Sequence, residues 1–123
     1  MSHPLAPLLD HVHIRVADLE ASRRFYTLAL APLGRAPTWE GEHAFELAEL
    51  FVSDDGLPTA RLHLAFRADG PDRVAAFHRA ALAAGGVDNG APGERPRYHP
   101  GYYSAYVLDP DGNNVEAVFH GRA

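Results

Sequence analysis

The chain of 123 residues contains no cysteine. This absence excludes a disulfide scaffold, a zinc site built on thiolates and a cysteine nucleophile. No apolar run approaches the 18 residues that a membrane-spanning helix needs, and no N-terminal apolar segment is typical of a signal peptide. We therefore expect a cytoplasmic protein that does not associate with membranes.

Basic residues are also few, because 11 Lys and Arg stand against 16 Asp and Glu, giving a formal net charge of -5. Proteins that bind nucleic acid usually carry a basic stripe, so we expect no nucleic-acid partner. The hydrophobic content of 46% is enough for a sizeable core in a chain of this length. We assign residues 1–123 to a single domain.

The two halves of the chain resemble each other. A shift of 52 positions aligns His11 with His63 and Phe25 with Phe77. The shift is close to half of the chain length, which indicates two copies of one supersecondary unit.

Each copy begins with a strand pattern. Residues 11–16 and 62–67 alternate between polar and apolar side chains, which is typical of a strand with one buried face. His11 and His63 lie at equivalent places on the polar faces of these strands. Their side chains are therefore expected to face a cavity or solvent.

A helix pattern follows each of these strands. The first begins at the N-cap Asp18 and ends at Gly34, and the second begins near Pro71 and ends at Gly86. The other segments predict strands at about 35–40, 43–48, 49–53, 102–108 and 113–120, and a loop over 89–101 with three prolines and three glycines. The order βαβββ–βαβββ predicts an α+β fold with mostly antiparallel sheets, in modules of about 9–55 and 60–120.

The polar faces predict a metal site. If the two copies pack face to face, His11, His63 and Glu116 approach a common pseudo-twofold axis. Two imidazoles and a carboxylate form a facial triad for a divalent ion, and a carboxylate in a cavity needs such a partner. This donor set suits Zn, Ni, Fe, Mn or Co alike.

Several alternatives remain open for this site. His13 lies on the same face as His11 and is the alternative ligand, while Glu46 or Glu49 is a candidate fourth ligand. The two modules can pair within one chain or between two chains, so the ligands can come from different subunits.

The segment from Arg95 to Tyr103 is rich in aromatic and basic side chains and is stiffened by proline, which suits a loop covering a substrate. We expect His99 to move protons and Glu116 to act in catalysis. The expected substrate-binding residues are Trp39, Arg95, Tyr98, Tyr102 and Tyr103.

Three segments in this order resemble a known family. Residues 11–26, 62–66 and 109–116 are similar to the module starts and the C-terminal signature of the vicinal oxygen chelate superfamily, which contains glyoxalases, bleomycin-resistance proteins and extradiol dioxygenases. The resemblance implies paired βαβββ modules that form a cupped, mostly antiparallel eight-stranded sheet. It also implies a homodimer and a divalent metal on His11, His63 and Glu116.

The resemblance also implies a function. We expect a metal-dependent, glyoxalase-like enzyme for a small oxygenated substrate that chelates the metal through adjacent oxygens. Because the chain is shorter than a typical two-domain extradiol dioxygenase, lyase or isomerase chemistry is favoured over dioxygenation. The alternative is a metal-free protein of the bleomycin-resistance kind that sequesters a small molecule in an aromatic groove.

Overall fold

The computed structural model describes residues 7–121, and each half of the chain forms one four-stranded sheet with a helix. The first half contains β1 (Val12–Arg15), α1 (Leu19–Leu30), the short 3-10 helix η1 (Ala31–Leu33), β2 (Trp39–Glu40), β3 (Ala44–Leu47) and β4 (Leu50–Ser53). The second half contains β5 (His63–Arg67), α2 (Pro71–Ala83), β6 (Val87–Glu94), β7 (Tyr102–Leu108) and β8 (Asn114–His120).

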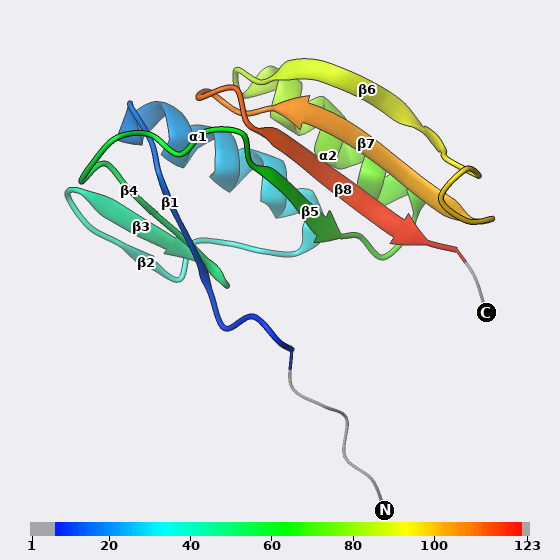
Figure 1. Cartoon of the computed structure of the whole chain (residues 1–123), viewed down its shortest axis with the longest axis horizontal. Helices are drawn as coiled ribbons and strands as arrows, with labels where there is room; N and C mark the ends of the chain where they lie inside the picture. Colours follow the sequence, from blue (N-terminus) through cyan, green and yellow to red (C-terminus); the bar gives the residue numbers. More distant parts are fainter. Residues whose placement is uncertain (1–6, 122–123) are drawn as a thin grey trace, which may run out of the picture.

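The two sheets share one topology. Their strand orders are β1-β4-β3-β2 and β5-β8-β7-β6. The pairs β1–β4 and β5–β8 are parallel, and the other neighbouring strands are antiparallel. The predicted α+β class is confirmed, with the eight strands divided between two open sheets (Figure 1).

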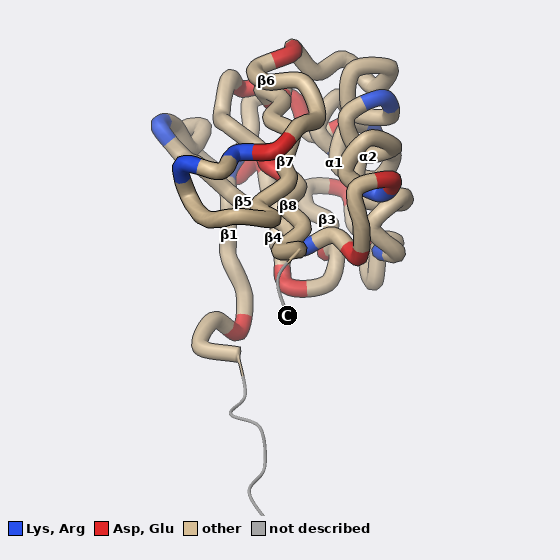
Figure 2. The backbone as a smooth tube through the Cα atoms, turned by 90° about the vertical axis from the view of Figure 1, so that its right-hand side faces the viewer, with Lys and Arg blue, Asp and Glu red and all other residues tan. Residues whose placement is uncertain are grey.

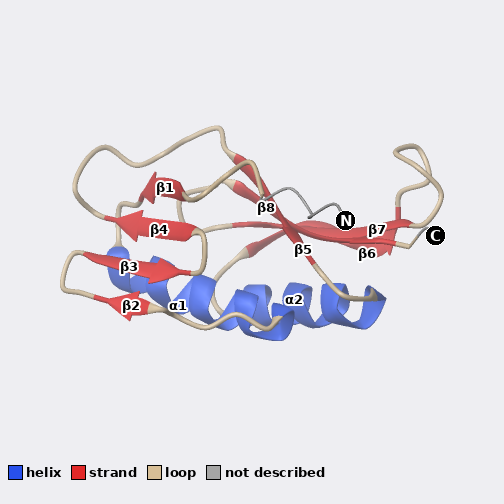
Figure 3. Cartoon of the chain, turned by 90° about the horizontal axis from the view of Figure 1, so that it is seen from below, coloured by secondary structure: helices blue, strands red, loops and turns tan. Residues whose placement is uncertain are grey.

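The molecule has a layer of sheets and a layer of helices. The two sheets lie side by side, and both helices cover the same side of them (Figure 3). A single core of buried residues, including Phe25, Phe45, Phe77 and Val107, draws on both halves. Because the helices cover only this side, the opposite faces of the sheets remain open, and we call them the open faces. Charged residues of both signs are spread over both layers (Figure 2).

Local signals position both helices as expected. The Asp18 carboxylate accepts a hydrogen bond from Ala21 N at 3.1 Å and caps α1. Gly34 adopts a φ of 80°, which ends the helical segment after η1. Pro71 begins α2, where its missing N–H costs nothing. Within the described part of the chain, neither helix is long and apolar enough to cross a membrane.

The expected loop over residues 89–101 is partly wrong, because residues 89–94 belong to the edge strand β6. The pairing of β6 with β7 shifts register between Asp88 and Gly90 and again between Gly90 and Gly93. These bulges break the alternation that marks a strand in the sequence. An edge strand also tolerates Pro92, which cannot donate to a neighbour.

The strand predicted over residues 35–40 is shorter than expected, because only Trp39 and Glu40 pair with β3.

The turn between β7 and β8 joins the two halves. Asp109 Oδ1 accepts bonds from the backbone N–H groups of Asp111 and Asn113, at 3.0 and 2.8 Å, and Gly112 adopts a φ of 85°. Asp111 Oδ1 in turn accepts a bond from Ala17 N, just before α1, at 3.0 Å. The Asp-Pro-Asp-Gly signature is therefore structural in this chain.

Candidate metal and substrate site

A buried carboxylate lies on the open face of the second sheet. Glu116 is only 1% exposed, although it points away from the helices. Its Oε1 lies 2.8 Å from His63 Nε2, and its Oε2 accepts a hydrogen bond from Tyr102 OH at 2.5 Å. Each carboxylate oxygen therefore has one partner.

The strand register explains this cluster. In the parallel pair of β5 and β8, His63 lies opposite Asn114 and Ala65 lies opposite Glu116. His63 and Glu116 are therefore diagonal neighbours on one face. On the other side of β8, Tyr106 of β7 lies opposite Glu116.

The surroundings of Glu116 keep the neighbouring phenols protonated. Burial raises the pKa of Tyr102, and the hydrogen bond to Glu116 and the charge of this carboxylate raise it further. Burial also raises the pKa of Tyr106; a hydrogen bond with Ser104 opposes this shift, and the charge of Glu116 adds to it. Both hydroxyl groups therefore remain available as donors at neutral pH.

His11 lies elsewhere, in a cavity of about 360 Å³ on the open face of the first sheet. Its ring is exposed, and Nδ1 lies 2.8 Å from Asp10 Oδ1. Within residues 7–121, no group of three or more His, Asp or Glu side chains is arranged to hold a metal ion. The expected face-to-face packing of the two halves does not occur within the chain, because the helices hold the halves side by side.

His13, the alternative ligand, lies beside His11 in this cavity. Its Nε2 lies 2.7 Å from Ser53 Oγ, and the Ser53 hydroxyl donates to Asp55 Oδ1 at 2.8 Å. Because a carboxylate can only accept, Ser53 receives its other bond from His13 Nε2–H. The ring edge of His13 packs against Phe51.

The first sheet has no counterpart of Glu116. In the second sheet, the residue two positions after His63 is Ala65, and Glu116 lies opposite it. In the first sheet, the residue two positions after His11 is His13, and Phe51 lies opposite it. Phe51 therefore occupies the equivalent place. Of the two expected candidates for a fourth ligand, Glu46 lines the cavity with His11, and Glu49 is exposed in the turn after β3.

The connection between β6 and β7 is a closed, hydrogen-bonded loop beside Glu116. Its ends are joined by the bond from Arg95 N to Tyr102 O at 2.7 Å. His99 Nε2 lies 2.9 Å from His120 Nδ1, and both rings contact Tyr102 edge-on. Tyr98 also packs against Tyr102, with ring centroids 4.9 Å apart. The loop thus brings Tyr98 and His99 next to Tyr102, while His120 reaches Tyr102 from β8.

Two of the expected substrate residues lie away from this cluster. Tyr103 extends from the opposite face of β7 and packs against the core, so it does not line the site. Trp39 lies on the open face of the first sheet, half-exposed and stacked on Phe51 with ring centroids 6.3 Å apart.

Sequence reasoning missed Tyr106 and His120. Tyr106 lies next to Glu116 and His63, and His120 pairs with His99. Strand alternation carried the signal, because side chains four residues apart lie on the same face of a strand. His120 therefore shares a face with Glu116, and Tyr106 shares a face with Tyr102.

The donor atoms of His63 and Glu116 fit a divalent metal. Imidazole nitrogen and carboxylate oxygen are common ligands of such ions. The separation of 2.8 Å suits two neighbouring ligands whose bonds are each about 2.0–2.2 Å long. A buried carboxylate on an open sheet face is also costly without a cationic partner. These two residues therefore offer two donors of the kind that a divalent ion takes, fewer than a complete metal site needs.

Comparisons with known proteins agree with this architecture. A glyoxalase/bleomycin resistance protein from Albidiferax ferrireducens T118 is 31% identical, with a TM-score of 0.80, covering 92% of this chain and 98% of that one. A glyoxalase-related enzyme from Fulvimarina pelagi is 24% identical, with a TM-score of 0.69 and 96% of each chain covered, and supports the fold alone. No curated protein matches the chain.

The family model of the Glyoxalase/Bleomycin resistance protein/Dioxygenase superfamily matches residues 8–117. The match spans both helices and every strand except the last three residues of β8, and it includes Glu116. The chain therefore belongs to this superfamily.

Proposed function

We propose that the protein is a cytoplasmic, divalent-metal-dependent, glyoxalase-like enzyme of the lyase or isomerase type. Its substrate is a small oxygenated molecule that chelates the metal through adjacent oxygens. The observation that supports this proposal best is the buried carboxylate of Glu116, set between His63 and Tyr102 on an open sheet face.

In this proposal the metal site forms between two chains. His63 and Glu116 of one protomer hold the ion together with His11 from the first sheet of its partner. The side-by-side halves support this arrangement, because they leave both open faces uncovered within one chain. Large apolar side chains are also exposed: Leu8, Leu9, Trp39 and Leu57. A twofold homodimer would place each first sheet over the partner's second sheet and give two identical sites.

The chain's own residues have distinct roles in this site. A bound divalent ion supplies Lewis-acid polarisation of a substrate oxygen. Glu116 would hold the ion and accept a proton from the substrate, and Tyr102 fixes its carboxylate by donating to Oε2. His99, joined to His120 and in contact with Tyr102, returns or removes a proton at the edge of the site.

Mixed dimers test both the ligands and the assembly. We expect His11→Ala, His63→Ala and Glu116→Ala each to lower metal affinity at least tenfold. A dimer of one His11→Ala chain and one Glu116→Ala chain keeps one complete site. Random mixing of these two variants should therefore restore metal to about a quarter of the sites.

Elemental analysis of the mixed sample, together with light scattering, measures the result. A mixture that stays metal-free while light scattering reports dimers would overturn the shared site. A monomer at micromolar concentration would overturn the assembly itself. Wild-type affinity in all three single variants would overturn the ligand assignment, and His13 would then be the residue to replace.

A second candidate function follows from the stack of Trp39 on Phe51. A half-exposed indole beside a cavity can bind a planar molecule without chemistry. In this role the protein sequesters a small molecule and holds no metal. Metal content after purification without chelator or affinity metal separates the two functions, because only the enzyme requires the ion.

A further inference from the structure

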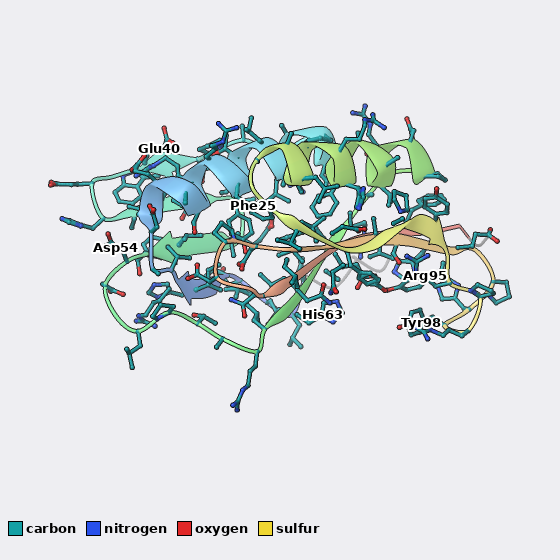
Figure 4. The ribbon with its side chains drawn as sticks, turned by 90° about the horizontal axis from the view of Figure 1, so that it is seen from above. Phe25, Glu40, Asp54, His63, Arg95 and Tyr98 are labelled. Atoms are coloured by element: carbon teal, nitrogen blue, oxygen red, sulfur yellow. The ribbon has the colours of Figure 1, made fainter. Side chains whose placement is uncertain are left out.

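Arg95 is a half-buried cation without a carboxylate partner among the described residues. It lies at the end of β6 and points to the open face of the second sheet, on the same side as His63 (Figure 4). A partly desolvated guanidinium usually has an anionic neighbour, because burial of an unpaired charge is costly. Its position therefore calls for an explanation.

Two bulges in β6 make room for this side chain. A Cβ on Gly93 would lie 2.9 Å from Arg95 Nη1, so the arginine rests directly on glycine backbone. A Cβ on Gly90 would lie 3.0 Å from Tyr106 Cδ1, and Gly90 has a φ of 156° that a side chain rarely adopts. The irregular strand thus seats Arg95 and Tyr106 side by side, and bulges of this kind often re-aim side chains beside active sites.

Backbone groups and an aromatic ring fix the guanidinium. Nη2 donates to Ala91 O at 2.7 Å, and Nη1 donates to Glu94 O at 3.4 Å. The guanidinium lies over the ring of Tyr106, 5.6 Å from its centroid. These bonds use two of the five N–H donors of arginine, so the others can bind a ligand. A guanidinium held in this way loses little freedom when it binds.

Arg95 is also close to the candidate metal ligands. Tyr106 lies opposite Glu116 in the sheet, and its ring centroid is 6.1 Å from that of His63. One aromatic ring therefore separates the guanidinium from the pair that would hold the ion. A small molecule can span this distance.

We infer that the substrate carries an anionic group, a carboxylate or a phosphate, that binds to Arg95 while its adjacent oxygens bind the ion that His63 and Glu116 would hold. This inference rests on the proposed function and names the substrate class of the same site. Arginine suits this role because its planar fork binds either oxyanion through two parallel hydrogen bonds.

Matched pairs of small molecules test the inference by calorimetry with the Mn²⁺-loaded protein. Dihydroxyacetone and its phosphate differ only in the phosphate, and lactate and malate differ by a second carboxylate. We expect dihydroxyacetone phosphate, malate or both to bind at least tenfold more tightly than the other molecule of the pair. The pair that shows the difference identifies the anion as a phosphate or a carboxylate.

Variants assign the difference to Arg95. Arg95→Gln should abolish the preference while its Mn²⁺ content stays at the wild-type level. Arg95→Lys keeps the positive charge but loses the planar guanidinium that donates two parallel hydrogen bonds, and should retain part of the preference. The matched control is Arg79→Gln, because Arg79 is an exposed arginine of α2, in the helix layer. It should bind like the wild type.

Each result decides the inference. If the wild type binds Mn²⁺ and dihydroxyacetone but shows no preference in either pair, the anionic group is wrong and the metal site stands. A preference that survives in both Arg95 variants also overturns the assignment. If the wild type binds no metal, the proposed function fails, and this inference fails with it.

Discussion

The hydroxyl of Tyr26 donates a 2.6 Å hydrogen bond to Asp109 Oδ2, and both residues are buried. Tyr26 lies in α1 of the first half, and Asp109 begins the turn after β7 in the second half. Burial raises the pKa of Tyr26, and the charge of Asp109 raises it further. This bond therefore couples the two halves through the interior.

Tyr26→Phe should destabilise the protein, because it leaves Asp109 Oδ2 buried without this donor. We expect a loss of about 1–3 kcal/mol in the free energy of unfolding. Urea denaturation measures it. Tyr98→Phe is the control, since Tyr98 is exposed and its hydroxyl accepts a bond from Arg97 at the surface, and it should change stability by less than about 0.5 kcal/mol. Equal stability of both variants would contradict the prediction.

Stability should also fall at alkaline pH. The pKa of Tyr26 in the folded protein is raised above the ordinary value of 10.0. The unfolded chain therefore loses this proton first, and ionisation above pH 10 favours unfolding. Urea denaturation between pH 8 and 11 should show a decline that begins near pH 10 and is less steep in Tyr26→Phe. An identical slope in the variant would exclude Tyr26 as a cause.

Gly86→Ala should disturb the contact between the halves. A Cβ at this position would lie 2.7 Å from Phe25 Cε1 and collide with Val107. Overpacking of a core costs about 1–3 kcal/mol, and thermal unfolding should show this loss. In the control Gly56→Ala the new Cβ meets only the flexible side chain of Arg15, so we expect almost no change.

Tyr102→Phe should weaken metal binding without unfolding the protein. The variant removes the donor to Glu116 Oε2 and frees the carboxylate to rotate. Loss of such a supporting bond lowers metal affinity by about tenfold or more. Metal titration by calorimetry measures it, with Tyr98→Phe as the matched control. Unchanged affinity would show that Tyr102 does not position Glu116.

Alternation and repeat length predicted much of the fold, because they report local burial. Both helices follow from their caps and apolar spacing, and the equivalence of His11 and His63 follows from the repeat. The β6 strand did not follow, because glycines and a proline at its bulges imitate a loop. Local pattern cannot distinguish an irregular edge strand from a connection.

The contact between His63 and Glu116 was within reach of the sequence, since each lies on a polar strand face. The position of Phe51 opposite His13 could not be predicted from the sequence, because it depends on how β4 pairs with β1. The bonds of Tyr102 also depend on register across β7 and β8. Side-chain partners across strands are set by pairing between distant segments, which periodicity does not contain.

The proposed division of the ligands between two open faces would link metal binding to protein concentration. In a dimer that shares each ion, the metal tightens the association of the chains by the same factor by which association tightens the metal. Dilution would then release the ion, and removal of the ion would shift the population toward single chains. Because the sheets are open, the number of active sites would thus depend on the concentrations of protein and metal ion as well as on the amino-acid sequence.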